Sequence, residues 1–170
     1  MTSLFRTAFN FPAGGSYGVA LLSRFPVLTS KRIALTSSGE QRILAVVDVE
    51  LAKGRVVPIG ITHMDLQAAA RATQATEIVA ELGNAPLAVL MGDLNAEPDA
   101  PAVKTLADAF TDAWTAAGTG TGYTIPVNTP GRRIDYVFLG KGWPKPTGAS
   151  VPMTTASDHL PVVVDVPLPP

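Results

Sequence analysis

The sequence contains no cysteine, which excludes disulfide bridges and thiolate-bound metals. Charged residues make up only 16% of the chain, the net charge is −1 and there is no large basic block, so strong nonspecific binding to a phosphate backbone is not indicated. No apolar run approaches about 18 residues, so we expect no membrane span. Residues 1–11 lack a basic stretch followed by an apolar one. No export signal is therefore visible, the compartment stays open, and the cytoplasm is the default expectation.

An apolar content of 46% over 170 residues predicts a globular chain, and we expect one domain over residues 1–170. Residues 1–16, 115–132 and 140–156 are expected to be irregular, and loop 115–132 is long enough to suggest a function or mobility. Because strands outnumber helices, the pattern favours a layered α/β sandwich. The predicted elements are strands over residues 19–22, 33–35, 43–51, 56–61, 87–91, 134–139 and 160–166, and helices over residues 67–82 and 101–110.

Chemistry-bearing side chains gather at the ends of these predicted strands. The chain has only two histidines, and both lie near acidic residues: His63 stands two positions before Asp65, and His159 directly follows Asp158. Two histidines distributed at random would rarely both fall beside acids at strand ends. Their joint placement predicts one site that handles a phosphate ester with a hard metal ion.

Asp93 and Asn95 follow another predicted strand. A carboxylate and an amide two residues apart on an extended chain point to the same side. The carboxylate can deprotonate or orient a water molecule, and the amide can hold a phosphoryl oxygen or the water itself. The alternative is an ordinary turn that ends the strand, since Gly, Asp and Asn all favour turns.

Asp158 and His159 form a second candidate pair. Asp158 offers a hard oxygen ligand suited to Mg²⁺ or Mn²⁺, and His159 can donate a proton to a phosphoryl oxygen. Adjacent strand residues point to opposite faces, so both can serve one site only at a bend, which Pro161 favours. The alternative is a surface aspartate beside a half-buried histidine.

Asp135 lies within an apolar predicted strand, where a charge is costly to bury without a partner. The expected partner is an imidazole, which the carboxylate would orient and keep protonated. A salt bridge with Arg132 or Arg133 is the alternative. These two arginines, with Arg24 and Arg42, are the basic candidates for substrate contacts, and each can also be an ordinary surface arginine.

Five sequence blocks, taken together and in order, resemble the endonuclease/exonuclease/phosphatase superfamily, which includes pancreatic DNase, abasic-site endonuclease and bacterial sphingomyelinase enzymes. The resemblance implies a four-layer α/β/β/α sandwich (DNase I-like) with the site at the sheet ends. It also implies a divalent metal cofactor, Mg²⁺ or Mn²⁺. The blocks are Ser16-Tyr17-Gly18-Val19-Ala20-Leu21-Leu22-Ser23-Arg24-Phe25-Pro26, Thr62-His63, Gly92-Asp93-Leu94-Asn95, Arg133-Ile134-Asp135-Tyr136-Val137-Phe138 and Ser157-Asp158-His159.

The resemblance also implies roles. Asp93 would activate or orient the attacking water, Asn95 would position the phosphate or a metal-bound water, and His159, oriented by Asp135, would stabilise the phosphoryl charge. His63 would lie near the leaving group. The full set of candidates is His63, Asp93, Asn95, Asp135 and His159 for catalysis; Tyr17, Arg24 and Arg133 for substrate binding; and Asp158, Asp93 and Asn95 for the metal.

One part of the family pattern is missing. Family members begin with a strand ending in asparagine, followed by a helix and a strand ending in Gln-Glu, whose glutamate is the principal metal ligand; nothing before Gly14 matches either block. Glu40, Glu50 and Glu97 do not stand in that context. We therefore expect an N-terminally incomplete sandwich with weak metal affinity and weak activity. We also expect self-association, as a homo-oligomer that covers exposed sheet edges.

Together these inferences predict a divalent-metal-dependent phosphoesterase that cleaves phosphodiesters of nucleic acid by in-line attack of water. Two alternatives stay open. The substrate could be a small phosphomonoester or a phospholipid head group, or the chain could be a catalytically impaired remnant or interaction module with the same fold. The sequence does not decide between DNA and RNA.

Overall fold

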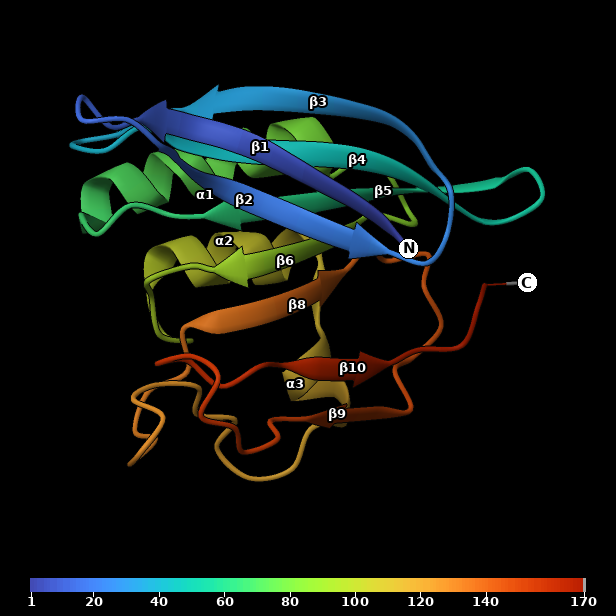
Figure 1. Cartoon of the computed structure of the whole chain (residues 1–170). Coiled ribbons are helices and arrows are strands. Elements are labelled where there is room, and N and C mark those ends of the chain that lie inside the picture. The colour runs from blue at the N-terminus through green and yellow to red at the C-terminus, as the bar shows by residue number, and fades with distance from the viewer. Residues whose placement is uncertain (170) are drawn as a thin grey trace.

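The computed structural model describes residues 1–169, and strands outnumber helices in it, as predicted (Figure 1). The elements in chain order are β1 (Thr2–Asn10), β2 (Ser16–Ser23), β3 (Val27–Leu35), β4 (Arg42–Ala52), β5 (Arg55–His63), α1 (Ala68–Leu82), β6 (Val89–Asp93), α2 (Pro101–Ala109), β7 (Thr111–Asp112), α3 (Ala113–Ala117), β8 (Asp135–Leu139), β9 (Gly148–Ser150) and β10 (Val163–Asp165).

A mixed six-stranded sheet in the order β3-β4-β5-β6-β8-β7 forms the centre of the molecule. Its neighbouring strands are antiparallel, except that β5 and β6 run parallel. Parallel neighbours need a crossover connection, and α1 provides it here. The consequence is that β5 and β6 end at the same edge of the sheet, where antiparallel β8 begins.

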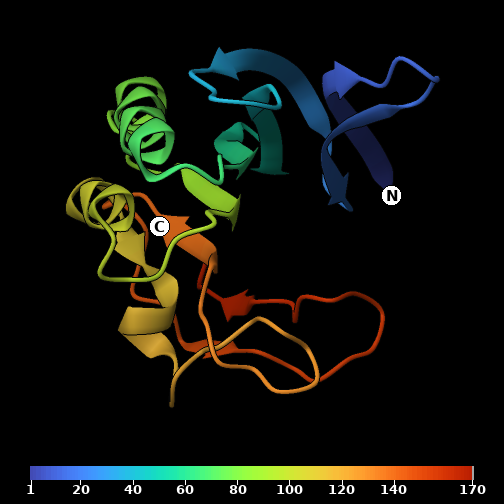
Figure 2. The same ribbon diagram turned by 90° about the vertical axis from the view of Figure 1, so that its left-hand side faces the viewer.

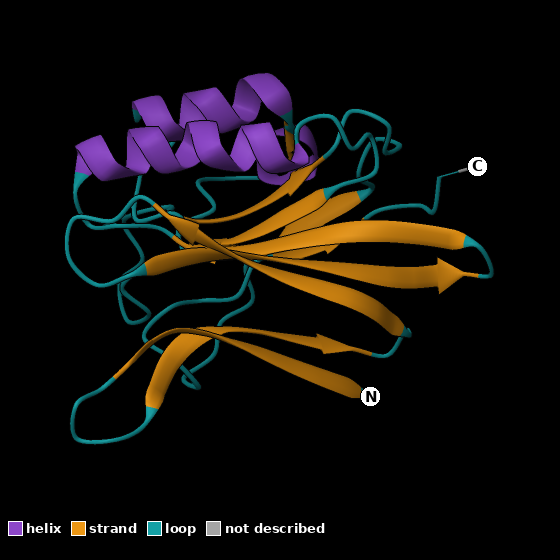
Figure 3. Cartoon of the chain, turned by 90° about the horizontal axis from the view of Figure 1, so that it is seen from above, coloured by secondary structure: helices purple, strands orange, loops and turns teal. Residues whose placement is uncertain are grey.

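The sheet separates two hydrophobic cores (Figure 3). Helices α1 and α2 cover one face, where Leu90 and Phe138 are fully buried. The β1–β2 hairpin lies over the other face and encloses a smaller core around Val47. No helix of the described residues is long and apolar enough to cross a membrane; the longest, α1, has 15 residues.

The α/β sandwich expected from the sequence is therefore confirmed, with a central mixed sheet. Residues 1–169 form a layer of helices, the six-stranded sheet and, on the second face, the two small sheets β1–β2 and β9–β10. Helices outside those small sheets, which would be the fourth layer, are not formed by this part of the chain.

Two predictions about local structure were wrong at the N-terminal side of the molecule. Residues 1–16 were expected to be irregular, but β1 pairs with β2 along its whole length, from Thr2 opposite Ser23 to Asn10 opposite Ser16. The alternation in β1 is masked by its small polar residues, so hydrophobic periodicity alone misses it. The third strand also starts earlier than predicted, at Val27.

The C-terminal side differs as well. A strand was predicted over residues 160–166, but β10 covers only Val163–Asp165 and pairs with β9 rather than with the large sheet. Leu160 is buried in a loop instead. Helix α3 begins just before the loop that was expected to be irregular, and the Asp112 carboxylate caps it by accepting from the Trp114 N–H.

A buried glutamine supports the loop that follows β5. Gln74 is completely buried on the sheet-facing side of α1. Its Oε1 accepts from the Asp65 N–H at 2.9 Å, and its Nε2 donates to the Thr36 carbonyl at 2.7 Å. One side chain thus joins α1, the loop after β5 and the loop after β3.

Asp65 extends this network. Its carboxylate accepts from the Ser38 N–H and hydroxyl, at 2.9 and 2.7 Å, and from the Gln67 N–H at 2.8 Å. Burial alone would raise the pKa of Asp65, but these hydrogen bonds, together with the nearby Arg42 charge, lower it below its ordinary value. The ionised carboxylate therefore holds the loop after β5 in one position, directly beyond His63.

We expect Gln74→Ala to lower the free energy of unfolding by about 1–3 kcal/mol, because it leaves the Asp65 N–H and the Thr36 carbonyl without their partner. Urea unfolding measures the change. Thr73→Ala is the matched control on the same helix, since Thr73 is exposed and bonds only the Ala69 carbonyl one turn earlier; it should change stability by about 0.5 kcal/mol or less. Equal effects of the two substitutions would contradict the role given to Gln74.

Candidate active site

Strand register brings three predicted site residues into one row. His63 of β5 lies opposite Asp93 of β6, and Asp93 lies opposite Asp135 of β8. Directly paired residues on neighbouring strands project to the same face and lie close together. The row therefore forms at the edge of the sheet that Figure 2 views end-on, where β2 also begins.

The end of β6 and the turn after it have backbone conformations that few residue types other than glycine and asparagine adopt. Gly92 has a φ of +148°, and a Cβ there would lie 1.9 Å from the Thr62 carbonyl oxygen, so a side chain would separate β6 from β5. Asn95 has a φ of +50°, in the left-handed region that asparagine tolerates. The segment is thus a turn, which was the alternative interpretation of its sequence. This turn nevertheless positions the two candidate side chains, Asp93 and Asn95.

Hydrogen bonds hold both of those groups. The Asn95 N–H donates to Asp93 Oδ1 at 2.7 Å, and Asn95 Nδ2 donates to the Met64 carbonyl at 2.9 Å. The amide plane is therefore held in one orientation, and no partner for Asn95 Oδ1 is found among the described residues. That oxygen can accept from a water molecule or contribute to a cation site.

His159 meets Asp135, as expected for an acid in an apolar strand. Nδ1 of His159 donates to Asp135 Oδ2 at 2.8 Å. The alternative partners are engaged elsewhere, because Arg132 pairs with Glu97 at 3.2 Å and Arg133 pairs with Asp112. Burial would lower the pKa of His159, but the surrounding carboxylates, Asp135 first among them, together outweigh burial and raise that pKa above its ordinary value.

The imidazole of His63 differs from that of His159, because its pKa is lowered rather than raised. Nε2 of His63 lies 3.4 Å from Asp93 Oδ2, and Nδ1 is hydrogen-bonded to the Tyr17 hydroxyl. Burial lowers the pKa of His63, and the Asp93 charge only partly opposes it, so the neutral form dominates at pH 7. Burial also raises the pKa of Asp93, and the neighbouring Asp135 adds to that effect while the Asn95 N–H opposes it.

Tyr17 is held from two sides. The Phe9 ring stacks on it at 5.3 Å between centroids, and the Arg42 guanidinium lies 5.9 Å from the Tyr17 ring centroid. Arg42 was one of the basic candidates for a substrate contact, but it is only 6% exposed and its Nη2 pairs with Glu40 at 3.3 Å. Its observed contact is therefore with Tyr17 and supports the ring whose hydroxyl meets His63.

The donor set suits a hard divalent cation. One ligand atom each of Asp93, Asp135 and His159 lie within 4.8 Å of one another. Carboxylate oxygens are what Mg²⁺ and Mn²⁺ prefer, and Mg²⁺ commonly uses one or two carboxylates and keeps several waters. Because Asp135 Oδ2 and His159 Nδ1 bond each other, the second Asp135 oxygen and Asp93 are the available ligands.

Three predicted residues are not brought into this cluster. Asp158 is exposed and accepts from the Ser157 hydroxyl at 3.2 Å, because the bend that carries His159 inward leaves its neighbour outside. Arg133 is buried and its guanidinium donates to both Asp112 oxygens, at 3.1 and 2.8 Å, so it is not free for a substrate.

Arg24 is far from the cluster because of its position relative to β2. It follows the end of β2, whereas Tyr17 stands at the start of that strand. With a rise of about 3.3 Å per residue, roughly 23 Å of strand separates the two residues. Arg24 is exposed there and lies over the Phe25 ring. The structure thus brings together Tyr17, His63, Asp93, Asn95, Asp135 and His159.

Gln74 and Ser38, which hold Asp65 and the loop after β5 in place, were not predicted from the sequence. A signal for Gln74 was present, because it falls on the same helical stripe as Ala70, Ile78 and Leu82. A polar residue on an apolar stripe has a buried partner, but the sequence does not identify it.

Comparison with solved structures supports the same architecture. An endonuclease/exonuclease/phosphatase protein from Bacteroides vulgatus matches with a TM-score of 0.83 and 20% identity over 98% of this chain and 76% of that one. The catalytic domain of human nocturnin, solved with a bound sulfate anion, matches with a TM-score of 0.76 and 22% identity, over 96% and 70%. A Bacteroides thetaiotaomicron mannosyl-6-phosphatase matches with a TM-score of 0.82 and 18% identity, over 98% and 77%. At these identities the likeness shows the fold alone.

A search of curated proteins finds no relative. The sequence model of one family, described as the endonuclease/exonuclease/phosphatase family, matches residues 2–159. That match covers most of the chain and spans every strand that contributes to the row of His63, Asp93 and Asp135. The chain therefore belongs to the endonuclease/exonuclease/phosphatase family.

Proposed function

We propose that this protein is a divalent-metal-dependent phosphodiesterase that cleaves nucleic acid. Members of its family are phosphoric-ester hydrolases. The observation that carries the proposal is the pairing of each carboxylate with one imidazole, Asp135 with His159 and Asp93 with His63, beside the amide of Asn95. This arrangement offers one cationic donor, one neutral imidazole and a basic carboxylate around a single point.

His159 is suited to hold the phosphoryl charge. Because its Nδ1 is held by Asp135, its Nε2 is left to donate to a non-bridging phosphoryl oxygen. The raised pKa of His159 keeps a larger share of the ring protonated near neutrality, which strengthens that hydrogen bond. Asp135 acts through His159 by fixing its tautomer and its orientation.

Asp93 and Asn95 are suited to position the attacking water. Burial raises the pKa of Asp93 above its ordinary value, so its carboxylate is a stronger base than an exposed aspartate. The fixed Asn95 amide can hold the same water through Oδ1. A Mg²⁺ or Mn²⁺ ion bound by Asp93 and Asp135 would supply positive charge that neutralises the phosphoryl oxygens.

His63 and Tyr17 are suited to the leaving-group side. The neutral imidazole is already hydrogen-bonded to the Tyr17 hydroxyl at one nitrogen and lies near Asp93 at the other. Once Asp93 has taken a proton from the attacking water, it can pass that proton to His63 Nε2, and His63 Nδ1 can release one through the Tyr17 hydroxyl to the departing alkoxide, so that both side chains end neutral.

A second candidate function is hydrolysis of a small phosphomonoester. It is favoured by one structural neighbour, which is named a mannosyl-6-phosphatase, and by the absence of a large basic surface block in the sequence. The same catalytic residues would serve both reactions, so substrate comparison must separate them.

We expect Mn²⁺-stimulated cleavage of plasmid DNA and bis-p-nitrophenyl phosphate that EDTA abolishes, and a loss of about 10²–10⁴-fold in His159→Ala. Arg24→Ala, at the far end of β2, is the matched control and should keep the wild-type rate. Hydrolysis of mannose 6-phosphate but not of the diesters would select the second candidate. Equal background turnover in wild type and His159→Ala would leave only a non-catalytic remnant.

We expect Asp135→Asn to lower the pKa of His159, because it removes the carboxylate that raises it while burial, which lowers it, remains. The titration of the imidazole C–H resonances by NMR measures this directly, and His63→Gln assigns the two histidines. Asp158→Asn should produce a smaller decrease, since Asp158 contributes least of the charges acting on His159. An unchanged or higher pKa in Asp135→Asn would contradict the positioning role of Asp135.

We also expect the protein to self-associate. The faces of β6 and β8 that point away from the helices carry the half-buried Met91 and Val137, whereas Leu90 and Phe138 on the helix side are fully buried. The β1–β2 hairpin exposes Phe5 and Leu22, which are 49% and 65% exposed. Open strand edges and adjoining apolar surface favour association with a second copy.

Light scattering after size exclusion should therefore give a mass above that of one 17.7-kDa chain. A double variant, Phe5→Lys with Leu22→Lys, should shift the protein toward monomer, while Leu168→Lys, also at an exposed apolar residue, should not. A monodisperse wild-type monomer at high concentration would contradict the expectation.

A further inference from the structure

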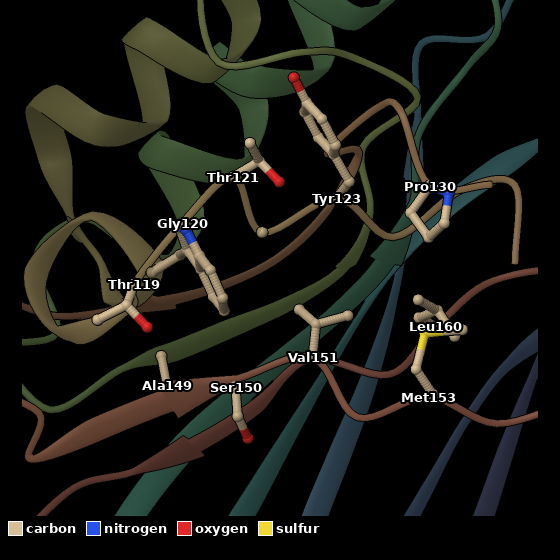
Figure 4. A pocket seen from close by; sticks show the side chains of 12 residues that line it. Thr119, Gly120, Thr121, Tyr123, Pro130, Ala149, Ser150, Val151, Met153 and Leu160 are labelled. Carbon is tan, nitrogen blue, oxygen red and sulfur yellow. The ribbon is translucent and has the colours of Figure 1, made fainter.

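A pocket of about 430 Å³ lies on the far side of the segment that carries His159. It is formed between residues 119–123 and residues 149–153, and Figure 4 shows Thr121 and Val151 directed toward its interior. Its volume falls within the range of about 300–1,000 Å³ typical of small-molecule sites. None of the catalytic candidates lines it.

The pocket and the catalytic imidazole share one stretch of backbone. Leu160, which lines the pocket and is only 3% exposed, directly follows His159. Its N–H donates to the Thr124 carbonyl at 2.7 Å, so the stretch is tied to the residue that follows Tyr123 on the opposite wall. One short, tied segment of backbone therefore carries His159 and supplies Leu160 to the wall of the pocket.

One wall is a tryptophan held in place by a glycine-rich loop. A Cβ at Gly118 would lie 2.5 Å from Trp114 Cδ2, and one at Gly122 would lie 2.4 Å from Trp114 Cε2. Gly122 also has a φ of +67°, which favours glycine. The loop thus packs directly on the indole, and Trp114 presents a preformed aromatic surface beside Tyr123.

The chemistry of the lining selects a neutral ligand. The lining residues include no charged side chain; the polar ones are Thr119, Thr121, Ser150 and Tyr123, of which Tyr123 and Ser150 direct their hydroxyls away from the interior (Figure 4), and the other lining side chains are aromatic or aliphatic. A phosphate or sugar phosphate would find no cation there. A flat, uncharged ring with donors and acceptors on its edges matches hydroxyl groups around aromatic and aliphatic walls.

We propose that this pocket binds a nucleobase of the substrate, next to the phosphate at His159. The proposal rests on the proposed function and narrows it to esters that carry a base. Stacking on an aromatic side chain is open to every base but not to a sugar, so the pocket would favour such esters over sugar phosphates.

The test uses adenosine, a neutral nucleoside with no phosphate, so that binding is measured apart from catalysis. Isothermal titration of the wild-type protein should give saturable binding of adenosine and none of ribose. Val151→Phe, which fills the pocket, should weaken adenosine binding at least tenfold. Val163→Phe, at an exposed valine of β10 outside the pocket, is the matched control and should not.

If Val151→Phe fails to fold, a second variant and a second measurement still test the pocket. Met153 is 69% exposed, so Met153→Glu should fold normally and still weaken binding by placing a charge at the rim. In Trp143→Phe, Trp114 is the one remaining tryptophan of the chain, and adenosine should quench its fluorescence.

The outcomes separate the two proposals. Failure of adenosine to bind, or binding that neither Val151→Phe nor Met153→Glu weakens, would overturn the base pocket even if diesters are hydrolysed. Adenosine binding that both variants weaken would support the pocket even if no ester is hydrolysed, and the catalytic proposal alone would then fail.

Discussion

The register of β5, β6 and β8 is the constraint on which the site depends. Because β5 and β6 run parallel and β8 runs antiparallel to β6, two strand ends and one strand start meet at one edge, and pairing places His63, Asp93 and Asp135 in a row. A slip of one residue in any of these pairs would turn a functional side chain to the helix-covered face. Gly92 secures the register, since only a residue without Cβ allows the Thr62 carbonyl to approach so closely.

The row also creates an electrostatic conflict that the neighbouring side chains resolve. Two carboxylates, Asp93 and Asp135, stand side by side and partly shielded from water, and burial together with the Asp135 charge raises the pKa of Asp93. Each is matched with a different imidazole, and the two histidines respond in opposite directions: the pKa of His159 rises and that of His63 falls. One type of side chain thus supplies both a cationic and a neutral group within a single site.

A site contact could be predicted from the sequence where neighbouring residues determine it, and could not where it depends on how distant segments are arranged in space. The Asp135–His159 contact was predictable, because an acid in an apolar strand requires a partner and the chain offers few. The role of Arg133 was not, because its choice between a substrate and Asp112 depends on where a two-residue strand, β7, lies in space. The position of Asp158 outside the cluster of Asp93, Asp135 and His159 was not predictable for a similar reason: adjacent residues diverge at a bend in a direction that only the loop geometry decides. Strand β1 was missed because small polar residues hide its alternation.

Residues that would recognise a substrate are more difficult to predict from this sequence than candidate catalytic residues, because the former lie mainly in loops and several of the latter lie at strand ends. Three of the candidate catalytic groups, His63, Asp93 and Asp135, lie at strand ends, which hydrophobic periodicity locates. The neutral pocket is instead built mainly from residues 119–123 and 149–151 with Trp114, Met153 and Leu160, most of which show no period. A chain with a net charge of −1 gains little long-range attraction for a polyanion, and its buried Arg133 is held by Asp112. Discrimination among phosphate esters must then come from short-range contacts to the uncharged part of the substrate, and a pocket one residue from His159 is well placed to make them.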